Sequence, residues 1–214
     1  MWRVSAMAGL LCGLLLSTLA RAAVDVGMPT STEIATAVSE EIADRKVCSQ
    51  YMTFDFRSDN GIALLRDKSW RGSDRAKKAI AAFVHEKLAT QGTQNDQNGN
   101  PVPTLQLTAA GKQAFDGGFG RGSLCFAKRK LVDIVMYTPP AAQDTYLVVN
   151  VVYRWTPTDV APWTAPLARA EALGGVSEAD LTATRRDTMV LVFTNHGWKA
   201  QGWFGNPIGK AAGR

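Results

Sequence analysis

Histidine and cysteine are scarce in this chain, which has two histidines and three cysteines among its 214 residues. One cysteine, Cys12, lies in an apolar leader. Four candidate metal ligands then remain: Cys48, Cys125, His85 and His196. They are too few and too scattered for a typical zinc site. The chain also lacks a Gly-x-Ser-x-Gly nucleophile motif, so no reaction class follows from it. Neither a cofactor nor a metal is predicted.

Only one long apolar run occurs, and it lies at the N-terminus. Arg3 precedes a stretch rich in Leu, Ala and Gly, which Ala20-Arg21-Ala22 ends with a small-x-small pattern. This arrangement is typical of a cleavable secretory signal peptide. The run is shorter than the ~20 residues of a spanning helix, although an uncleaved anchor and a lipid-modified cysteine stay open as alternatives. We expect a signal peptide over residues 1–22.

The excess of positive charge is small. Cleavage of the 22-residue leader from the 214-residue chain would leave 192 residues. It would also remove Arg3 and Arg21, which leaves 22 basic and 19 acidic residues and a net charge of +3. That charge neither demands nor excludes an acidic partner. No later apolar run is long enough to span a membrane, so we expect a soluble mature protein, periplasmic or secreted.

The two cysteines of the mature chain are expected to pair. Outside the cytoplasm, two thiols in a domain of this size usually form a disulfide. A bond between Cys48 and Cys125 would span 77 positions, which corresponds to about 4 kcal/mol of stabilisation in the chain-entropy model. Two free buried thiols are the alternative.

Helical periodicity marks the first half of the chain. Thr30 and Glu33 predict a capping box for a helix over residues 30–45. Its expected buried stripe is Ile34, Ala37, Val38 and Ile42. A short strand is predicted over residues 51–56. A second helix is predicted to begin at Ser73 and to end at a left-handed Gly92. Its expected buried stripe is Ala76, Ile80, Phe83, Val84 and Leu88.

Turn and strand signals follow. Asn98-Gly99 predicts the tip of a hairpin, and Thr108 predicts the cap of a short helix. Beyond a glycine-rich link, strands are predicted over residues 124–137, 144–155, 188–194 and 198–203, with a helix over 165–173. In the second strand, side chains from Leu147 to Trp155 alternate, so that Asn150 and Arg154 point away from the core.

These elements predict an α+β fold, with a helical half followed by a small antiparallel sheet carrying one or two helices. The expected regions are residues 23–116 and 117–204, with a loose tail over 205–214. A disulfide between Cys48 and Cys125 would hold the two regions together.

Two resemblances accompany this interpretation. The order of elements over residues 31–116, closed by Leu107-Thr108-Ala109-Ala110-Gly111, resembles a winged helix, with Asn98-Gly99 at the tip of its wing. The segments around Cys125, Tyr137-Thr138-Pro139-Pro140 and Thr194-Asn195-His196-Gly197-Trp198 resemble a family of exported bacterial proteins of unassigned function. The second resemblance covers the mature chain and implies export and architecture, but no activity.

Three functions were weighed. The winged-helix resemblance implies nucleic-acid binding through the cations of the second helix. The leader directs the domain away from the genome, however, so a nucleic-acid partner is disfavoured. An envelope hydrolase is the alternative, and it would need His196, Asp133 or Asp55 to meet in one cleft.

Non-catalytic binding of an envelope protein or glycan is the favoured function. The chain is rich in tryptophan, and two or more exposed rings would form a docking surface. The expected surface consists of Trp155, Trp163, Trp198, Trp203, Asn150 and Arg154.

Overall fold

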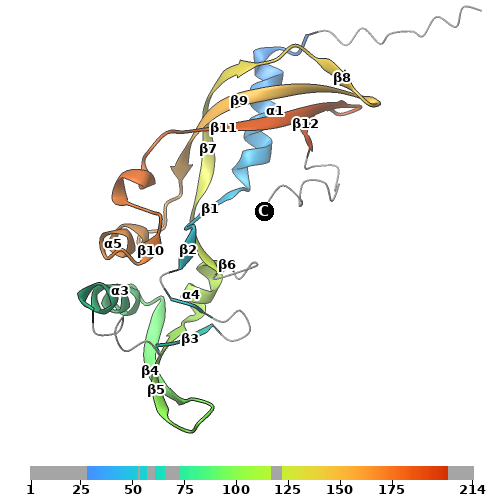
Figure 1. The fold of residues 1–214 in the computed structure, drawn as a ribbon. Helices are drawn as coiled ribbons and strands as arrows, with labels where there is room; N and C mark the ends of the chain where they lie inside the picture. The colour runs from blue at the N-terminus through green and yellow to red at the C-terminus, as the bar shows by residue number, and fades with distance from the viewer. Residues whose placement is uncertain (1–27, 53, 57–60, 66–72, 117–121, 202–214) are drawn as a thin grey trace, which may run out of the picture.

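The computed structural model describes residues 28–52, 54–56, 61–65, 73–116 and 122–201 (Figure 1). The predicted signal peptide, Trp203 and the predicted tail lie outside these residues. Among the described residues, no helix has both the length and the apolar composition needed to cross a bilayer.

A large, curled antiparallel sheet is the main element of the fold (Figure 1). Its strands lie in the order β1-β7-β9-β11-β12, while β6 pairs with β7 and β8 pairs with β9. The strand bounds are Lys46–Cys48 (β1), Phe115–Asp116 (β6), Ser123–Tyr137 (β7), Ala141–Gln143 (β8), Tyr146–Thr158 (β9), Arg185–Thr194 (β11) and Gly197–Ala200 (β12).

Strand β7 departs from regular pairing at two places. Its register against β9 shifts between Leu131 and Asp133 and again between Ile134 and Met136. Such bulges bend a strand and increase its twist. The strands β7, β9 and β11 therefore form a concave inner face and a convex outer face.

Alternation along β9 assigns its side chains to these two faces, as the sequence predicts. Val149, Val151 and Tyr153 are each 0% exposed, and Trp155 is 4% exposed. Asn150 and Arg154 are exposed. The inner face of the sheet is thus apolar, and it needs a covering element.

Helix α1 (Ser31–Ala43) covers the inner face. Thr30 and Glu33 form the predicted capping box, and Ile34, Val38 and Ile42 are each 0% exposed. These side chains form one core cluster with residues of β1, β7, β9, β11 and β12. The predicted buried stripe of this helix is confirmed.

A second core cluster lies at the other end of the molecule. It contains residues of a three-stranded sheet, in the order β3-β5-β4, and of helices α3 and α5. Phe83 of α3 is completely buried, and its ring lies 5.3 Å from Phe54 and 5.9 Å from Phe56, between ring centroids. The bounds are Ile62–Leu64 (β3), Asp74–His85 (α3), Ala89–Asn95 (β4), Pro101–Leu107 (β5), Ala109–Ala114 (α4) and Thr164–Arg169 (α5).

Three short elements and a disulfide bond lie between the two core clusters. Strand β2 (Tyr51–Met52) pairs with β10 (Leu173–Gly174), and a 3-10 turn at Glu178–Leu181 precedes β11. The Sγ atoms of Cys48 and Cys125 lie 2.03 Å apart, the distance of a disulfide bond, as predicted. These cysteines lie directly opposite each other on β1 and β7. Leu124 on one side of the bond belongs to the second cluster, and Phe126 on the other side belongs to the first.

The predicted fold class is wrong. We predicted a winged-helix-like helical half followed by a small sheet, but the described residues contain more strand than helix, with one large curled sheet and four short helices. The physical reason lies in α1. Its apolar stripe was predicted correctly, yet it packs against strands near the C-terminus of the chain and not against α3.

The end of α3 was also predicted wrongly. The helix stops at His85, and Lys87 takes the left-handed conformation with φ 57°. The amide of Leu88 then donates to the carbonyl of Phe83 at 2.9 Å, which satisfies a free carbonyl at the helix end. Gly92 lies in β4 opposite Thr104. The turn at Lys87 places Leu88 in the core, where it is 1% exposed.

Candidate functional site

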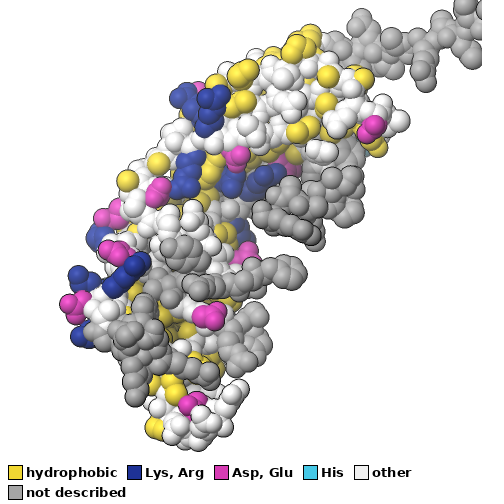
Figure 2. Space-filling view, viewed as in Figure 1, with side chains coloured by type: hydrophobic (Ala, Val, Ile, Leu, Met, Phe, Trp, Pro, Cys, Tyr) yellow, Lys and Arg dark blue, Asp and Glu magenta, His cyan; other side chains and the backbone are white. Residues whose placement is uncertain are grey.

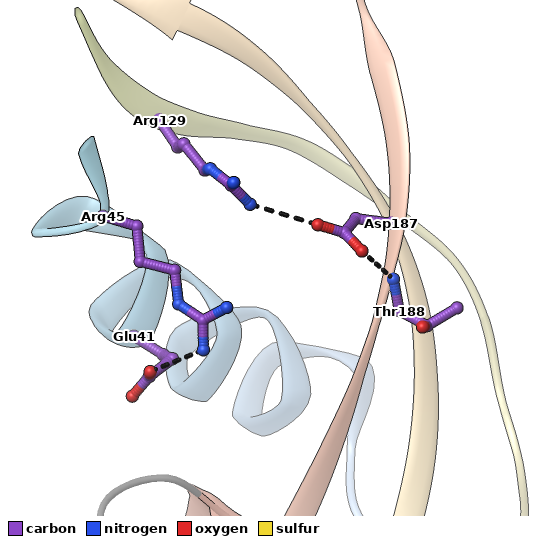
Figure 3. A network of polar contacts seen from close by, with 5 residues as sticks. All are labelled: Glu41, Arg45, Arg129, Asp187 and Thr188. Atoms are coloured by element: carbon purple, nitrogen blue, oxygen red, sulfur yellow. Dashed lines mark hydrogen bonds and ion pairs between the residues drawn. The ribbon is translucent and has the colours of Figure 1, made fainter. Parts of the chain in front are cut away.

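A polar cluster lies on the concave face of the sheet, beyond the end of α1 (Figure 3). Arg129 extends from β7 over the ring of Trp155 on β9, with 4.4 Å between the guanidinium carbon and the ring centroid. Its Nη1 atom reaches Asp187 on β11 at 3.1 Å. Arg129 therefore bridges three strands by a cation–π contact and an ion pair.

Tyr153 lies within this cluster, directly opposite Asp187 in the strand register. Its hydroxyl is buried and, like Nε of Arg129, has no hydrogen-bond partner in the described part of the chain. Burial, and then the charge of Asp187, raise the pKa of Tyr153. The charges of Arg45 and Arg129 oppose that rise, as does a contact with the Arg129 guanidinium that does not meet hydrogen-bond geometry. Because Arg129 and Asp187 neutralise each other, we interpret the cluster as part of the core.

The side chains of the predicted docking surface do not lie together. Trp155 and Trp198 are buried at 4% and 5% exposure in the first core cluster, so neither ring forms an open surface. Trp163 is half-buried and contacts both clusters. Asn150 and Arg154 are exposed on the opposite, convex face, and Trp203 lies outside the described residues. The rings fill the core because they alternate inward along strands.

The residues named for the hydrolase alternative occupy separate places. Asp133 pairs with Arg154 across β7 and β9, with 2.8 Å between Oδ1 and Nε. The hydrogen bond from Arg154 lowers the pKa of Asp133, so this carboxylate is tied to a cation. His196 is exposed at the turn between β11 and β12, and Asp55 is exposed in the segment after β2.

One group of metal-ligand types does come together. Cys48, Asp116 and Cys125 lie within ligand distance of one another. The two sulfur atoms are at disulfide distance, and a disulfide sulfur is not the thiolate that binds metals. Cys48 and Cys125 therefore form a covalent bond, and we do not interpret the group as a metal centre.

The edge of β7 is the clearest binding feature of the described structure. Along residues 131–137, β7 pairs with β9 on one side. On its other side, β1 and β6 reach only residues 123–128. No described residue pairs with the remaining edge, so it presents free amide and carbonyl groups.

A groove follows this edge. It has a volume of about 720 Å³ and lies between α1 and β7, where Thr32, Ala35 and Ser39 face Leu131, Val132 and Ile134. Most of its lining side chains are small or apolar. A strand added to β7 would place alternate side chains into this groove. Glu40 also lines it and is paired with Lys199.

Apolar side chains are exposed beside the groove. Val132, Val135 and Met136 of β7 are 49%, 43% and 56% exposed. The space-filling view shows hydrophobic side chains along the top of the molecule, in the region where the ribbon shows β7 and β9 (Figures 1 and 2). Apolar groups gathered at an open sheet edge favour contact with another chain.

The chain matches no family model, and no curated protein or solved structure is similar to it at a significant level. The open edge has one sequence signal, which is a group of apolar residues, Val132, Ile134 and Val135, around Asp133 within a long strand. The sequence could not show that this strand would lie at an edge, because strand order depends on contacts distant in the chain.

Proposed function

We propose that this protein is exported and acts in the periplasm or outside the cell as a non-catalytic binding or accessory protein. Its partner is an envelope protein that supplies an extended segment to the edge of β7. The leader over residues 1–22 and the cysteine pair support export. The unpaired edge at residues 131–137 is the observation that carries the binding function.

The chemistry of that edge favours a protein over a glycan. The edge offers backbone amide and carbonyl groups, and an extended polypeptide can pair with such groups. The register shifts between Leu131 and Asp133 and between Ile134 and Met136 divide this edge into short pairing segments. The exposed side chains of Val132, Val135 and Met136 add apolar contacts. The two carboxylates nearest this edge are paired with cations, Glu40 with Lys199 and Asp133 with Arg154.

A nucleic-acid partner is less well supported. The cations predicted to face phosphate are Arg75, Lys77, Lys78 and Lys87. Of these four, Arg75 pairs with Glu171 and Lys77 pairs with Asp74. Half of that charge is therefore already matched by carboxylates on the same surface.

The proposal is tested with the mature protein, its disulfide verified by intact mass, as bait for envelope extract. A V132K/V135K variant places two charges on the edge, which blocks strand addition. Thr188→Lys is the matched control, because Thr188 is exposed on β11, away from the edge. We expect one protein to bind the parent and the control, and not the V132K/V135K variant.

Hydrogen exchange on the captured complex locates the contact. The expected result is slower exchange of amides within residues 131–137, because added-strand hydrogen bonds protect them. Three results would contradict the proposal: no specific protein is captured, the V132K/V135K variant binds as well as the parent, or protection falls elsewhere on the chain.

A further inference from the structure

A second hollow lies where the two core clusters meet, beside the Cys48–Cys125 pair. Its volume is about 350 Å³, within the range of small-ligand sites. Helix α4 forms one side, strands β1 and β7 form another, and the segment leading into α5 forms the third. We call it the junction pocket.

Two lysines line the junction pocket. Lys46 of β1 and Lys128 of β7 are directly opposite each other in the antiparallel register. Like charges in this arrangement repel and destabilise the sheet. Neither lysine has an ion-pair partner in the described part of the chain, whereas the neighbouring Arg129 is paired with Asp187. A bound anion would remove the repulsion.

An aromatic ring, an amide and a carboxylate complete the pocket. Trp163 is half-buried, and its contacts with both core clusters hold it in place. Gln113 and Asp159 also line the pocket, and both are exposed. Asp159 has φ 53°, a left-handed conformation that costs energy for residues other than glycine.

We propose that the junction pocket binds an anionic sugar. The ring of the sugar contacts Trp163, its carboxylate or phosphate lies between Lys46 and Lys128, and its hydroxyl groups bond to Gln113 and Asp159. An apolar wall with few polar groups is the usual composition of a small-molecule site. The paired lysines supply point charges that serve carboxylate and phosphate alike. This inference is independent of the β7 edge, which lies on other residues.

The test titrates four probes into the mature protein by calorimetry: sodium glucuronate, glucose 6-phosphate, glucose and sodium acetate. We expect saturable binding of glucuronate, glucose 6-phosphate or both, and which one binds identifies the anion. Lys46→Met and Lys128→Met should each weaken this binding about tenfold, a loss of about 1.4 kcal/mol. Lys130→Met is the matched control, because Lys130 is exposed on β7 but does not line the pocket.

A second readout needs no ligand. Each single lysine substitution should raise the melting temperature of the free protein, and added salt should shrink that gain because it screens the repulsion. Lys130→Met should not show the gain.

The proposal is overturned if neither anionic sugar binds or if the Lys46→Met and Lys128→Met proteins bind as tightly as the parent. Acetate that binds as tightly as glucuronate would show that the ring contact is wrong. Glucose that binds as tightly would show that the lysines do not recognise the ligand.

Discussion

Replacement of Tyr153 by phenylalanine should stabilise the protein, although it removes a polar group from a cluster of charged residues. The Tyr153 side chain is completely buried, and its hydroxyl has no hydrogen-bond partner in the described part of the chain. Phenylalanine keeps the ring and its packing while it removes the unsatisfied oxygen.

The size of the effect follows from desolvation. A buried donor or acceptor without a partner costs about 1–3 kcal/mol. Since the ring contacts are retained, we expect Tyr153→Phe to raise the free energy of unfolding by about 1 kcal/mol. For a chain of this length, that corresponds to an increase in melting temperature of about 2–4 °C.

Tyr137→Phe is the matched control for this experiment. The hydroxyl of Tyr137 donates to the carbonyl of Pro29 at 3.2 Å, so its loss should lower the free energy of unfolding by about 0.5–1.5 kcal/mol. Urea unfolding at pH 8 measures both variants. The reasoning is refuted if Tyr153→Phe destabilises the protein as much as Tyr137→Phe, because the buried hydroxyl must then have a partner.

The pH dependence gives an independent check on the same residue. Burial and the charge of Asp187 raise the pKa of Tyr153 above its ordinary value of 10.0. Above about pH 10 the unfolded chain releases the phenol proton while the folded chain keeps it, so the parent loses stability as pH rises towards the folded pKa. Tyr153→Phe lacks this loss, and its advantage over the parent should widen between pH 9 and pH 11.

Two further predictions concern the disulfide bond between Cys48 and Cys125 and the close approach of Gly111 to Leu88. Replacing Cys48 and Cys125 together by serine should lower the free energy of unfolding by about 4 kcal/mol. If a reductant does not lower the urea midpoint of the parent protein, the disulfide bond is contradicted. Gly111→Ala should lower the free energy of unfolding by about 1–3 kcal/mol, because an added Cβ would lie 2.0 Å from the carbonyl oxygen of Leu88. An unchanged melting temperature would contradict that contact. Gln113→Ala on the same helix is the control.

Local elements followed from local signals in the sequence. The capping box at Thr30, the turn at Asn98-Gly99 and the cap at Thr108 are confirmed in the structure, because each depends on residues only a few positions apart. The strands β7, β9 and β11 also correspond to predicted strands, and their ends differ from the predicted ends by three residues at most.

The assembly of these elements could not be predicted in the same way. A periodic stripe such as Ile34, Val38 and Ile42 states which face of a helix is buried, but not which element covers it. The short strands β1, β3 and β10 have two or three residues each, too few for a pattern. The junction pocket depends on the register of β1 against β7, which aligns Lys46 with Lys128, and nothing near either lysine indicates that pairing.

The position of α1 on the large sheet has a consequence for the order in which the chain acquires its structure. Glu40 of α1 pairs with Lys199 of β12, a partner 159 positions away. The helix near the start of the chain therefore has no completed surface to cover until the last strands are present. Contacts at such separation form slowly, because a long loop must close before they stabilise anything. For this reason we expect the core cluster around α1 to stay unformed while β11 and β12 are still missing, and to gain its structure in one late cooperative step.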